Sequence, residues 1–319
     1  MRRQFFRIFF AAAMAAVFSA QALAARLLIP VGEVVGLSIR DGSVTVAAFH
    51  ETMGAVARDA GICIGDEILS LDGRRVDSVA ELYDALKCSG GTVTLALRRE
   101  GKELQLKLRP AVTAEGPRLG VYIREGVTGI GTVTYYDPNS GGFGCLGHGI
   151  NGSRGALAPM EGGWIYDAAV ESVKRGRAGE PGQLRGAVSS EIPIGTLRRN
   201  TARGVFGGAQ GWKGEALPIA EPEQVRPGPA RILSNVRGDE VCFFDVQILR
   251  CRPDSDGRDL LIKVTDPELL ETTGGIVAGM SGSPIIQDGR LIGAVTHVLV
   301  NDPTTGYGIF IENMLDAAA

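Results

Sequence analysis

The chain has little of what several protein classes require. Only three of its 319 residues are histidine and they are scattered, so the sequence assembles no metal site. None of the five cysteines forms a Cys-x-x-Cys pair, which leaves a zinc ribbon or a thioredoxin-type centre unsupported. Basic residues number 33 against 36 acidic ones, whereas a nucleic-acid surface needs a basic excess. We therefore expect no metal, no organic cofactor and no nucleic-acid partner.

Long apolar runs are also missing, except at the N-terminus. Three arginines within the first seven residues precede an apolar stretch over 8–19, and small residues recur in a small-x-small pattern over 20–24. This pattern is typical of a secretory signal peptide. An uncleaved anchor is the alternative, although an apolar stretch over 8–24 is short for a bilayer span. We expect an exported protein whose residues 1–24 are a signal peptide or a membrane anchor.

The five cysteines are an odd number for an exported chain, which would meet an oxidising compartment. Cys242 and Cys251 lie close enough in sequence to bridge a hairpin, and free thiols are the alternative.

Aromatic residues make up only 6% of the chain, whereas glycine is abundant, with 45 residues. This balance favours short strands and tight turns over a helical bundle. Over 31–110 the pattern is mixed, with a helix predicted over 78–87 because Ser78 can cap it and Glu81 follows three residues later. Residues 111–119, rich in small and polar side chains, are expected to be a linker.

The run Gly61-Ile62 to Asp72-Gly73, followed by that helix, resembles a PDZ domain. PDZ domains bind an extended peptide as an added strand. By this resemblance the peptide-binding positions are Gly36, Leu37, Ser38 and Ile39, and the groove takes a peptide ligand or a segment of the chain itself.

Residues 119–319 read as a second domain. Short, glycine-punctuated segments follow one another throughout it, which predicts an all-β sandwich or barrel. The fold class expected for the whole chain is therefore mainly β, with a small α+β domain in front of a larger β domain.

The motif Gly279-Met280-Ser281-Gly282-Ser283-Pro284 leads into a short strand, a turn and a return strand. It resembles the nucleophile segment of chymotrypsin-like serine proteases, which are double β-barrels. Flanking glycines let the backbone bend and let substrate approach Ser281. The N–H groups of Gly279 and Ser281 then form an oxyanion hole.

A serine nucleophile needs a base, and histidine is the usual one. His50 lies in the PDZ-like part, so His148 is the expected base. His297 lies on the return strand with Thr296, and we expect both in the substrate cleft. The orienting acid stays open on residue type alone. The candidates are Asp167, Asp239, Asp245, Asp254, Asp256, Asp259 and Asp266.

A closer resemblance covers nearly the whole chain. The segments 146–150, 264–267, 274–284, 293–303 and 306–311 are similar to those of SpoIVB-type sporulation peptidases. That resemblance implies the triad His148, Asp266 and Ser281. It also implies self-processing near the N-terminus and cleavage of the extracytoplasmic part of a membrane-protein regulator. By the same resemblance, the cleavage takes place in the intermembrane space of the developing spore and triggers activation of a late sigma factor. The alternative function is a catalytically silent PDZ adaptor.

Overall fold

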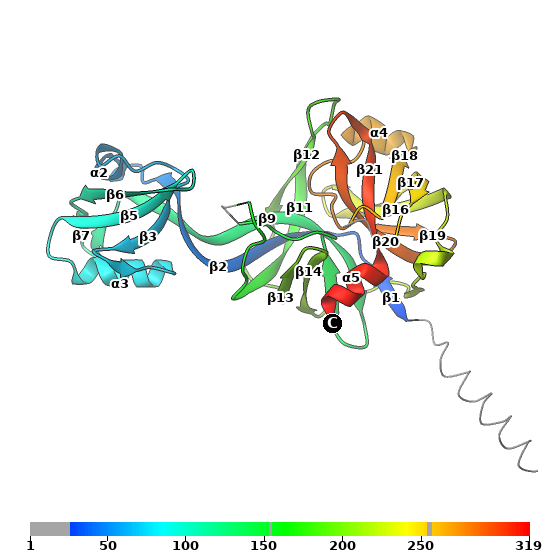
Figure 1. The fold of residues 1–319 in the computed structure, drawn as a ribbon, viewed down its shortest axis with the longest axis horizontal. Coiled ribbons are helices and arrows are strands. Elements are labelled where there is room, and N and C mark those ends of the chain that lie inside the picture. The colour runs from blue at the N-terminus through cyan, green and yellow to red at the C-terminus, as the bar shows by residue number, and fades with distance from the viewer. Residues whose placement is uncertain (1–25, 153–154, 254–256) are drawn as a thin grey trace, which may run out of the picture.

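The computed structural model of the chain describes residues 26–152, 155–253 and 257–319. The predicted leader, residues 1–24, lies outside this part. Figure 1 shows a small lobe joined by a long two-stranded ribbon to a larger body made of two barrels. Within the described ranges, no helix combines the length and apolar character needed to span a bilayer. The mainly β fold class is confirmed, with an α+β lobe and a double barrel.

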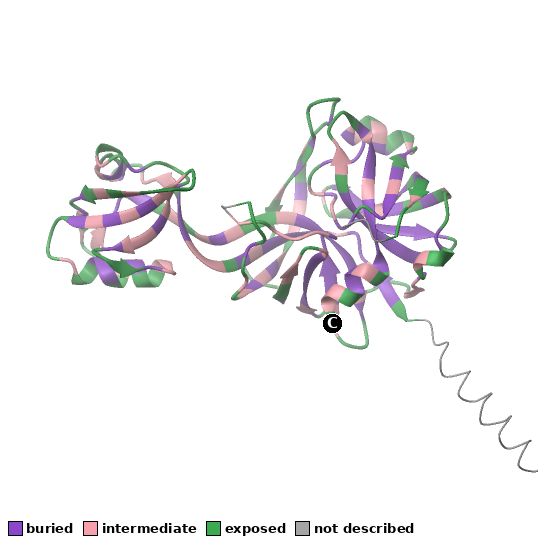
Figure 2. Ribbon diagram, viewed as in Figure 1, coloured by how far each residue is buried: buried purple, intermediate pink, exposed green. Residues whose placement is uncertain are grey.

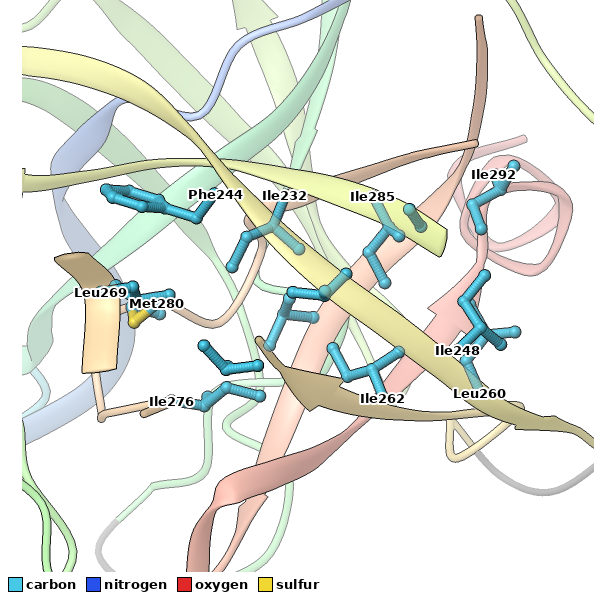
Figure 3. Packing of buried hydrophobic residues seen from close by; sticks show 14 of the residues in the cluster. Ile232, Phe244, Ile248, Leu260, Ile262, Leu269, Ile276, Met280, Ile285 and Ile292 are labelled. Carbon is cyan, nitrogen blue, oxygen red and sulfur yellow. The ribbon is translucent and has the colours of Figure 1, made fainter. Parts of the chain in front are cut away.

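The C-terminal part of the chain forms a closed antiparallel barrel. Its strands follow in the order β16 (Gly228–Arg237), β17 (Glu240–Cys251), β18 (Leu260–Val264), β21 (Asp302–Phe310), β20 (Arg290–Leu299) and β19 (Pro284–Gln287). The alternation of buried and exposed residues along β18 follows from the period of two in a strand. Ile232, Ile248 and Ile262 pack inside the barrel and are inaccessible to solvent (Figure 3). Burial of each such side chain stabilises the fold by about 1.5–3 kcal/mol.

The other barrel comes from segments that are distant in sequence. Its ring consists of β2 (Val34–Phe49), β9 (Val121–Asp137), β10 (Gly142–Cys145), β14 (Gly204–Ala209), β13 (Gly195–Thr201) and β11 (Gly162–Lys174). Three short strands extend it, namely β1 (Leu27–Pro30), β15 (Leu217–Pro218) and β12 (Gln183–Val188). Ile39, Phe143 and Ile165 are fully buried in its core.

Short helices border the barrels: η1 (Pro222–Gln224), α4 (Pro267–Thr273) and α5 (Ile311–Ala318). Ile311 and Met314 of α5 are inaccessible to solvent in a cluster between the barrels, and Ala317 and Ala318 pack beside them. The C-terminal tail therefore lies against the double barrel and away from the small lobe (Figure 1).

The small lobe has its own core. It contains α2 (Gly54–Asp59), β3 (Glu67–Leu71), β4 (Arg74–Arg75), α3 (Val79–Cys88), β5 (Val93–Arg99), β6 (Lys102–Leu108), β7 (Ala111–Thr113) and β8 (Gly116–Arg118). The predicted cap of α3 is confirmed, because the Ser78 hydroxyl accepts the Glu81 N–H. Leu82 and Leu86 point from α3 into the core, where they meet Val44 and Leu95.

The structure divides the chain differently from the predicted ranges 31–110 and 119–319. Strands β2 and β9 are each long enough to run through both the lobe and the first barrel, and they pair along most of their length. Ile39 belongs to the barrel core, whereas Val44 and Val121 belong to the lobe core. The lobe is therefore an insertion within the first barrel. Figure 2 shows mostly intermediate and exposed residues where the ribbon joins the two parts.

Of the two alternatives for Cys242 and Cys251, the structure excludes the bridge. Both residues lie on β17, nine positions apart along one extended strand, which separates them by roughly 30 Å. A disulfide needs Cα atoms within about 7 Å. All five cysteines are free.

Candidate active site

The nucleophile candidate sits in a tight turn that enters β19. Gly279 and Gly282 have φ angles of +102° and +99°, which an L side chain rarely adopts. A Cβ on Gly282 would lie 2.0 Å from the Thr132 carbonyl oxygen, so only glycine lets the turn pass β9. The Gly282 N–H donates to the Val295 carbonyl at 2.7 Å, which ties the turn to β20.

Two N–H groups in this turn are left for substrate. The N–H groups of Met280, Gly282 and Ser283 all donate to backbone carbonyls. The N–H groups of Gly279 and Ser281 have no protein acceptor among the residues that the structure describes. This is the pair predicted for the oxyanion hole, where free donors are needed. The side chain of Leu184 packs against Gly279 and supports its position.

The Ser281 hydroxyl is hydrogen-bonded to the opposite strand. Its Oγ donates to the Thr296 carbonyl of β20 at 2.8 Å. The Thr296 hydroxyl in turn donates to the Gly257 carbonyl at 2.9 Å. Attack on a substrate therefore requires the Ser281 hydroxyl to leave this carbonyl.

His148 follows β10 at the seam between the barrels. Its Nδ1 lies 2.9 Å from the Gly149 carbonyl oxygen. Because a carbonyl only accepts, Nδ1 carries the proton and Nε2 keeps its lone pair. Burial lowers the pKa of His148, and the hydrogen bond to Gly149 offsets part of that effect. The imidazole is therefore neutral near neutral pH, as a general base must be.

One cavity of about 550 Å³ brings the predicted residues together. Its lining includes Gly279, Ser281, His148, Thr296 and His297. The His148 and His297 rings are 5.2 Å apart, centroid to centroid. The pKa of His297 is lowered by its partial burial, by His148 and by Arg258. Nucleophile, neutral imidazole and free N–H groups in one cavity can carry out acyl transfer.

The predicted peptide-binding strand is not an open edge. Leu37 pairs with Ile165 of β11 on one side and with Gly129 of β9 on the other. Gly36, Ser38 and Ile39 are enclosed in the same way. A strand with both edges paired cannot add a peptide, so the assignment of Gly36–Ile39 to a PDZ groove is wrong.

The lobe has an open edge elsewhere. The first residues of β9, from Val121 to Glu125, pair with β2 on one side only. Helix α3 borders the opposite side, where Glu125 accepts the N–H of Val79. A cavity of about 430 Å³ lies at the start of this edge and is lined by Tyr83, Arg118, Gly120, Val121 and others. Gly120, at φ +78°, comes directly after the predicted linker, and the run Arg118-Leu119-Gly120-Val121 was the sequence signal for this edge.

A scan against protein families matches residues 115–315 to SpoIVB peptidase S55. The match spans well over half of the chain. The chain belongs to the SpoIVB peptidase S55 family. It is thus a serine peptidase of a sporulation family, and its substrates are proteins or peptides.

Residues 53–99 of this S55 peptidase match the PDZ domain family. Among solved structures, the chain is similar to the PDZ domain of the SdrC-like protein from Listeria monocytogenes. The identity is 25%, over 25% of this chain and 85% of that domain, with a TM-score of 0.22. No curated protein matches the chain.

Asp266 does not face His148 in this S55 peptidase. One carboxylate oxygen accepts the Leu269 N–H at 3.0 Å, which makes Asp266 the N-cap of α4. The other accepts the Asp245 N–H at 3.2 Å. In the described ranges no hydrogen bond joins Asp266 to His148, so the structure contradicts its predicted role as the orienting acid. The sequence Asp266-Pro267-Glu268 carries this signal, because Asp before Pro is typical of a helix start.

Within the described ranges, none of the other candidate acids is hydrogen-bonded to His148. Buried Asp259 accepts N–H groups from Phe310 and Asn313. Asp254 and Asp256 lie outside the described residues. In the structure the Gly149 carbonyl is the group that fixes the His148 tautomer.

Proposed function

We propose that this S55 peptidase is an exported serine endopeptidase that processes itself near the N-terminus and then cleaves a membrane-protein regulator. The target segment is extracytoplasmic and lies in the intermembrane space of the developing spore. Its cleavage leads to activation of a late sigma factor. Family membership and the signal-like pattern over residues 1–24 support the proposal.

The observation that carries the enzymatic part is the composition of the catalytic cavity. Ser281 lies in a turn with two unused N–H groups, and His148 in the same cavity is held as the tautomer with a free Nε2. A protein that used this domain only as a scaffold would have no need of this combination.

The residues suggest one sequence of steps. The Ser281 hydroxyl turns from the Thr296 carbonyl, gives its proton to His148 Nε2 and attacks the scissile carbonyl carbon. The oxyanion is held by the N–H groups of Gly279 and Ser281. His148 then protonates the leaving amine, and a water molecule hydrolyses the acyl ester on Ser281 to complete the turnover.

A fluorophosphonate probe tests this function directly, because it labels only an activated serine. We expect wild-type protein to be labelled and Ser281→Ala and His148→Ala to remain unlabelled. Circular dichroism of the three proteins checks that each is folded.

One observation favours the adaptor alternative: the Ser281 hydroxyl is hydrogen-bonded to the Thr296 backbone carbonyl. Folded wild-type protein that resists labelling, even after peptide ligands are added, would support the adaptor and overturn the endopeptidase.

Export is tested by fusing residues 1–30 to alkaline phosphatase, which is active only outside the cytoplasm. An active fusion supports export, and N-terminal sequencing of the mature protein separates a cleaved leader from an anchor.

A further inference from the structure

The free edge of β9 joins the PDZ lobe to the catalytic cavity. From Val121 to Gly131, β9 pairs with β2 along one edge, and within the described chain no strand covers its other edge. At Thr132 this other edge meets the nucleophile turn, because the Thr132 N–H donates to the Ser281 carbonyl at 3.1 Å. An unpaired strand edge is a template for an added strand.

Each end of this edge opens into one of the two cavities. Residues 127–130 of β9 line the catalytic cavity together with Ser281. Gly120 and Val121, at the start of the strand, line the cavity of the PDZ lobe. A single strand therefore borders both binding sites.

Backbone groups along the edge point outward in both halves. The Thr132 N–H and C=O point away from β2, because they bond to Ser281 and Leu146. Since backbone direction alternates along a strand with a period of two, the N–H and C=O groups of Ile130 and Thr128 also point away from β2. In the lobe, the Val46 N–H donates to the Asp66 carbonyl, on the side of β2 away from β9. Val46 and its partner Ile123 are therefore a non-hydrogen-bonded pair, and the N–H and C=O of Ile123 face the free edge of β9.

The two sites also require the same chain direction. A peptide that binds a PDZ edge with its C-terminal carboxylate at the loop before the strand runs antiparallel to that strand. Its upstream residues therefore extend from Gly120 toward Ser281. A substrate whose scissile carbonyl lies at Ser281 and whose leaving side follows β9 toward Val121 is antiparallel as well.

We propose that one extended substrate segment occupies both sites at once, with its free C-terminus in the PDZ cavity and its scissile bond at Ser281. The proposal rests on the endopeptidase function proposed above. Eleven strand positions separate Val121 from Thr132, so the bound segment spans about 36 Å and cleavage occurs roughly 10–13 residues before the C-terminus.

The geometry of the ribbon fixes this length. At Gly126 the strand turns with φ +65°, and a Cβ there would lie 1.9 Å from the Ile39 carbonyl oxygen. The bulge in β2 between Ile39 and Val44 lies opposite this position. Because the ribbon is hydrogen-bonded and bends at one glycine, it holds the distance between the two cavities within a narrower range than a flexible linker would.

The cavity of the lobe suits an apolar last residue with a free carboxylate. Met53 and Val121 supply apolar surface, and the Arg118 guanidinium lies 4.6 Å from the centroid of the Tyr83 ring. Arg118 pairs with Glu115, but the Glu115 side chain is 81% exposed. Such an exposed pair is weak, so an incoming carboxylate can compete for Arg118.

The chemical step gives the two products different fates. When the peptide bond breaks, the C-terminal fragment leaves as a free amine, protonated by His148, while the upstream part stays esterified to Ser281 until water releases it. The fragment of about a dozen residues is the part held along β9, and it competes with the next substrate.

The test uses the full chain and a pool of unstructured 30-residue peptides ending in Leu or Val, each made with a free C-terminus and as the amide. Mass spectrometry of the products should show cleavage clustered 10–13 residues from the free C-terminus. Amidation should lower kcat/KM at least tenfold. Arg118→Ala should lower cleavage of the free acids to the rate for the amides, whereas Arg74→Ala, an exposed arginine outside the cavity, should not.

Equal cleavage of acid and amide, or cuts at scattered distances from the terminus, would overturn the proposal while leaving a working endopeptidase. Absence of cleavage and of fluorophosphonate labelling would instead count against the endopeptidase.

Binding can be tested without turnover in Ser281→Ala. Peptides carrying benzophenone at position 3 or 12 from a free C-terminus should crosslink to the PDZ lobe and to the catalytic cavity, respectively. Crosslinks from both positions to the same site would contradict one continuous bound segment.

Discussion

Gly279 combines a positive φ angle with a crowded position. A Cβ there would lie 2.9 Å from the Leu184 side chain, so alanine must shift the turn that carries the Gly279 N–H, the proposed oxyanion donor. Loss of one oxyanion donor lowers kcat about 10²–10³-fold. We expect Gly279→Ala to show a loss of this size in a peptide-cleavage assay.

Gly289 provides the matched control for this substitution. It has φ +72° in the turn after β19, and a Cβ there meets nothing within 4 Å. Gly289→Ala should carry a similar backbone cost of about 1–2 kcal/mol and leave kcat unchanged. Equal losses of kcat in the two variants would show that strain alone explains the effect.

The lowered pKa of His148 predicts the pH dependence of cleavage. The base must be neutral, so activity should rise through a midpoint below the ordinary histidine value of about 6.5 and be flat at neutral pH. The unfolded state binds the proton more readily, so stability contributed by neutral His148 is lost as pH falls below about 6.5. Activity and urea-unfolding profiles between pH 5 and 8 measure both effects, and an activity midpoint above 7 would contradict them.

At the scale of single residues, the motif leads to side chains that the structure places in one cavity. Ser281 and Gly279 stand in a recognisable turn, and the choice between three histidines places His148 in the cavity with them. Asp266 was different, because an aspartate looks alike in sequence whether it orients an imidazole or caps a helix. Its hydrogen bonds to the Leu269 and Asp245 N–H groups are the structural fact that distinguishes the two.

Among the elements, α4 depends on its N-cap. Substitution of a capping aspartate by alanine costs about 1 kcal/mol, and serine restores most of it. We expect Asp266→Ala to lower the free energy of unfolding by this amount and Asp266→Ser to recover it, as measured by chemical denaturation. An Asp266→Asn variant that keeps its stability and yet loses activity a thousandfold would return Asp266 to the catalytic triad.

Strands β2 and β9 were the elements that sequence reasoning divided incorrectly. A polar segment interrupts each strand where one core ends and the next begins, at residues 40–43 in β2 and 124–126 in β9. In the sequence such a segment looks like a turn between two separate strands, so it does not reveal a continuous ribbon. Which residues share a core is decided by long-range packing, so Ile39 and Val44, five positions apart, belong to different cores. The helix α3 was predictable because its cap and its apolar face are local.

For the whole molecule, the insertion predicts that the lobe can be removed. Ile39 and Val127 are paired neighbours in the ribbon, so an Asn-Gly turn replacing residues 40–126 should close a hairpin of β2 and β9. We expect the shortened protein to fold and to react with fluorophosphonate, and to lose the difference between free-acid and amide peptides. The same deletion in Ser281→Ala controls for unspecific labelling, and an unfolded product would mean that the barrel depends on the lobe.

The insertion also orders events during synthesis. The two strands that close the first barrel are separated by the whole lobe, and closing so long a loop is entropically costly while its residues are unfolded. Once the lobe has folded around its own core, it holds Val44 and Glu125 side by side, and the loop is already closed. We infer that the peptide-binding lobe folds first and nucleates the barrel, so that no active serine can form before the domain that selects its substrate.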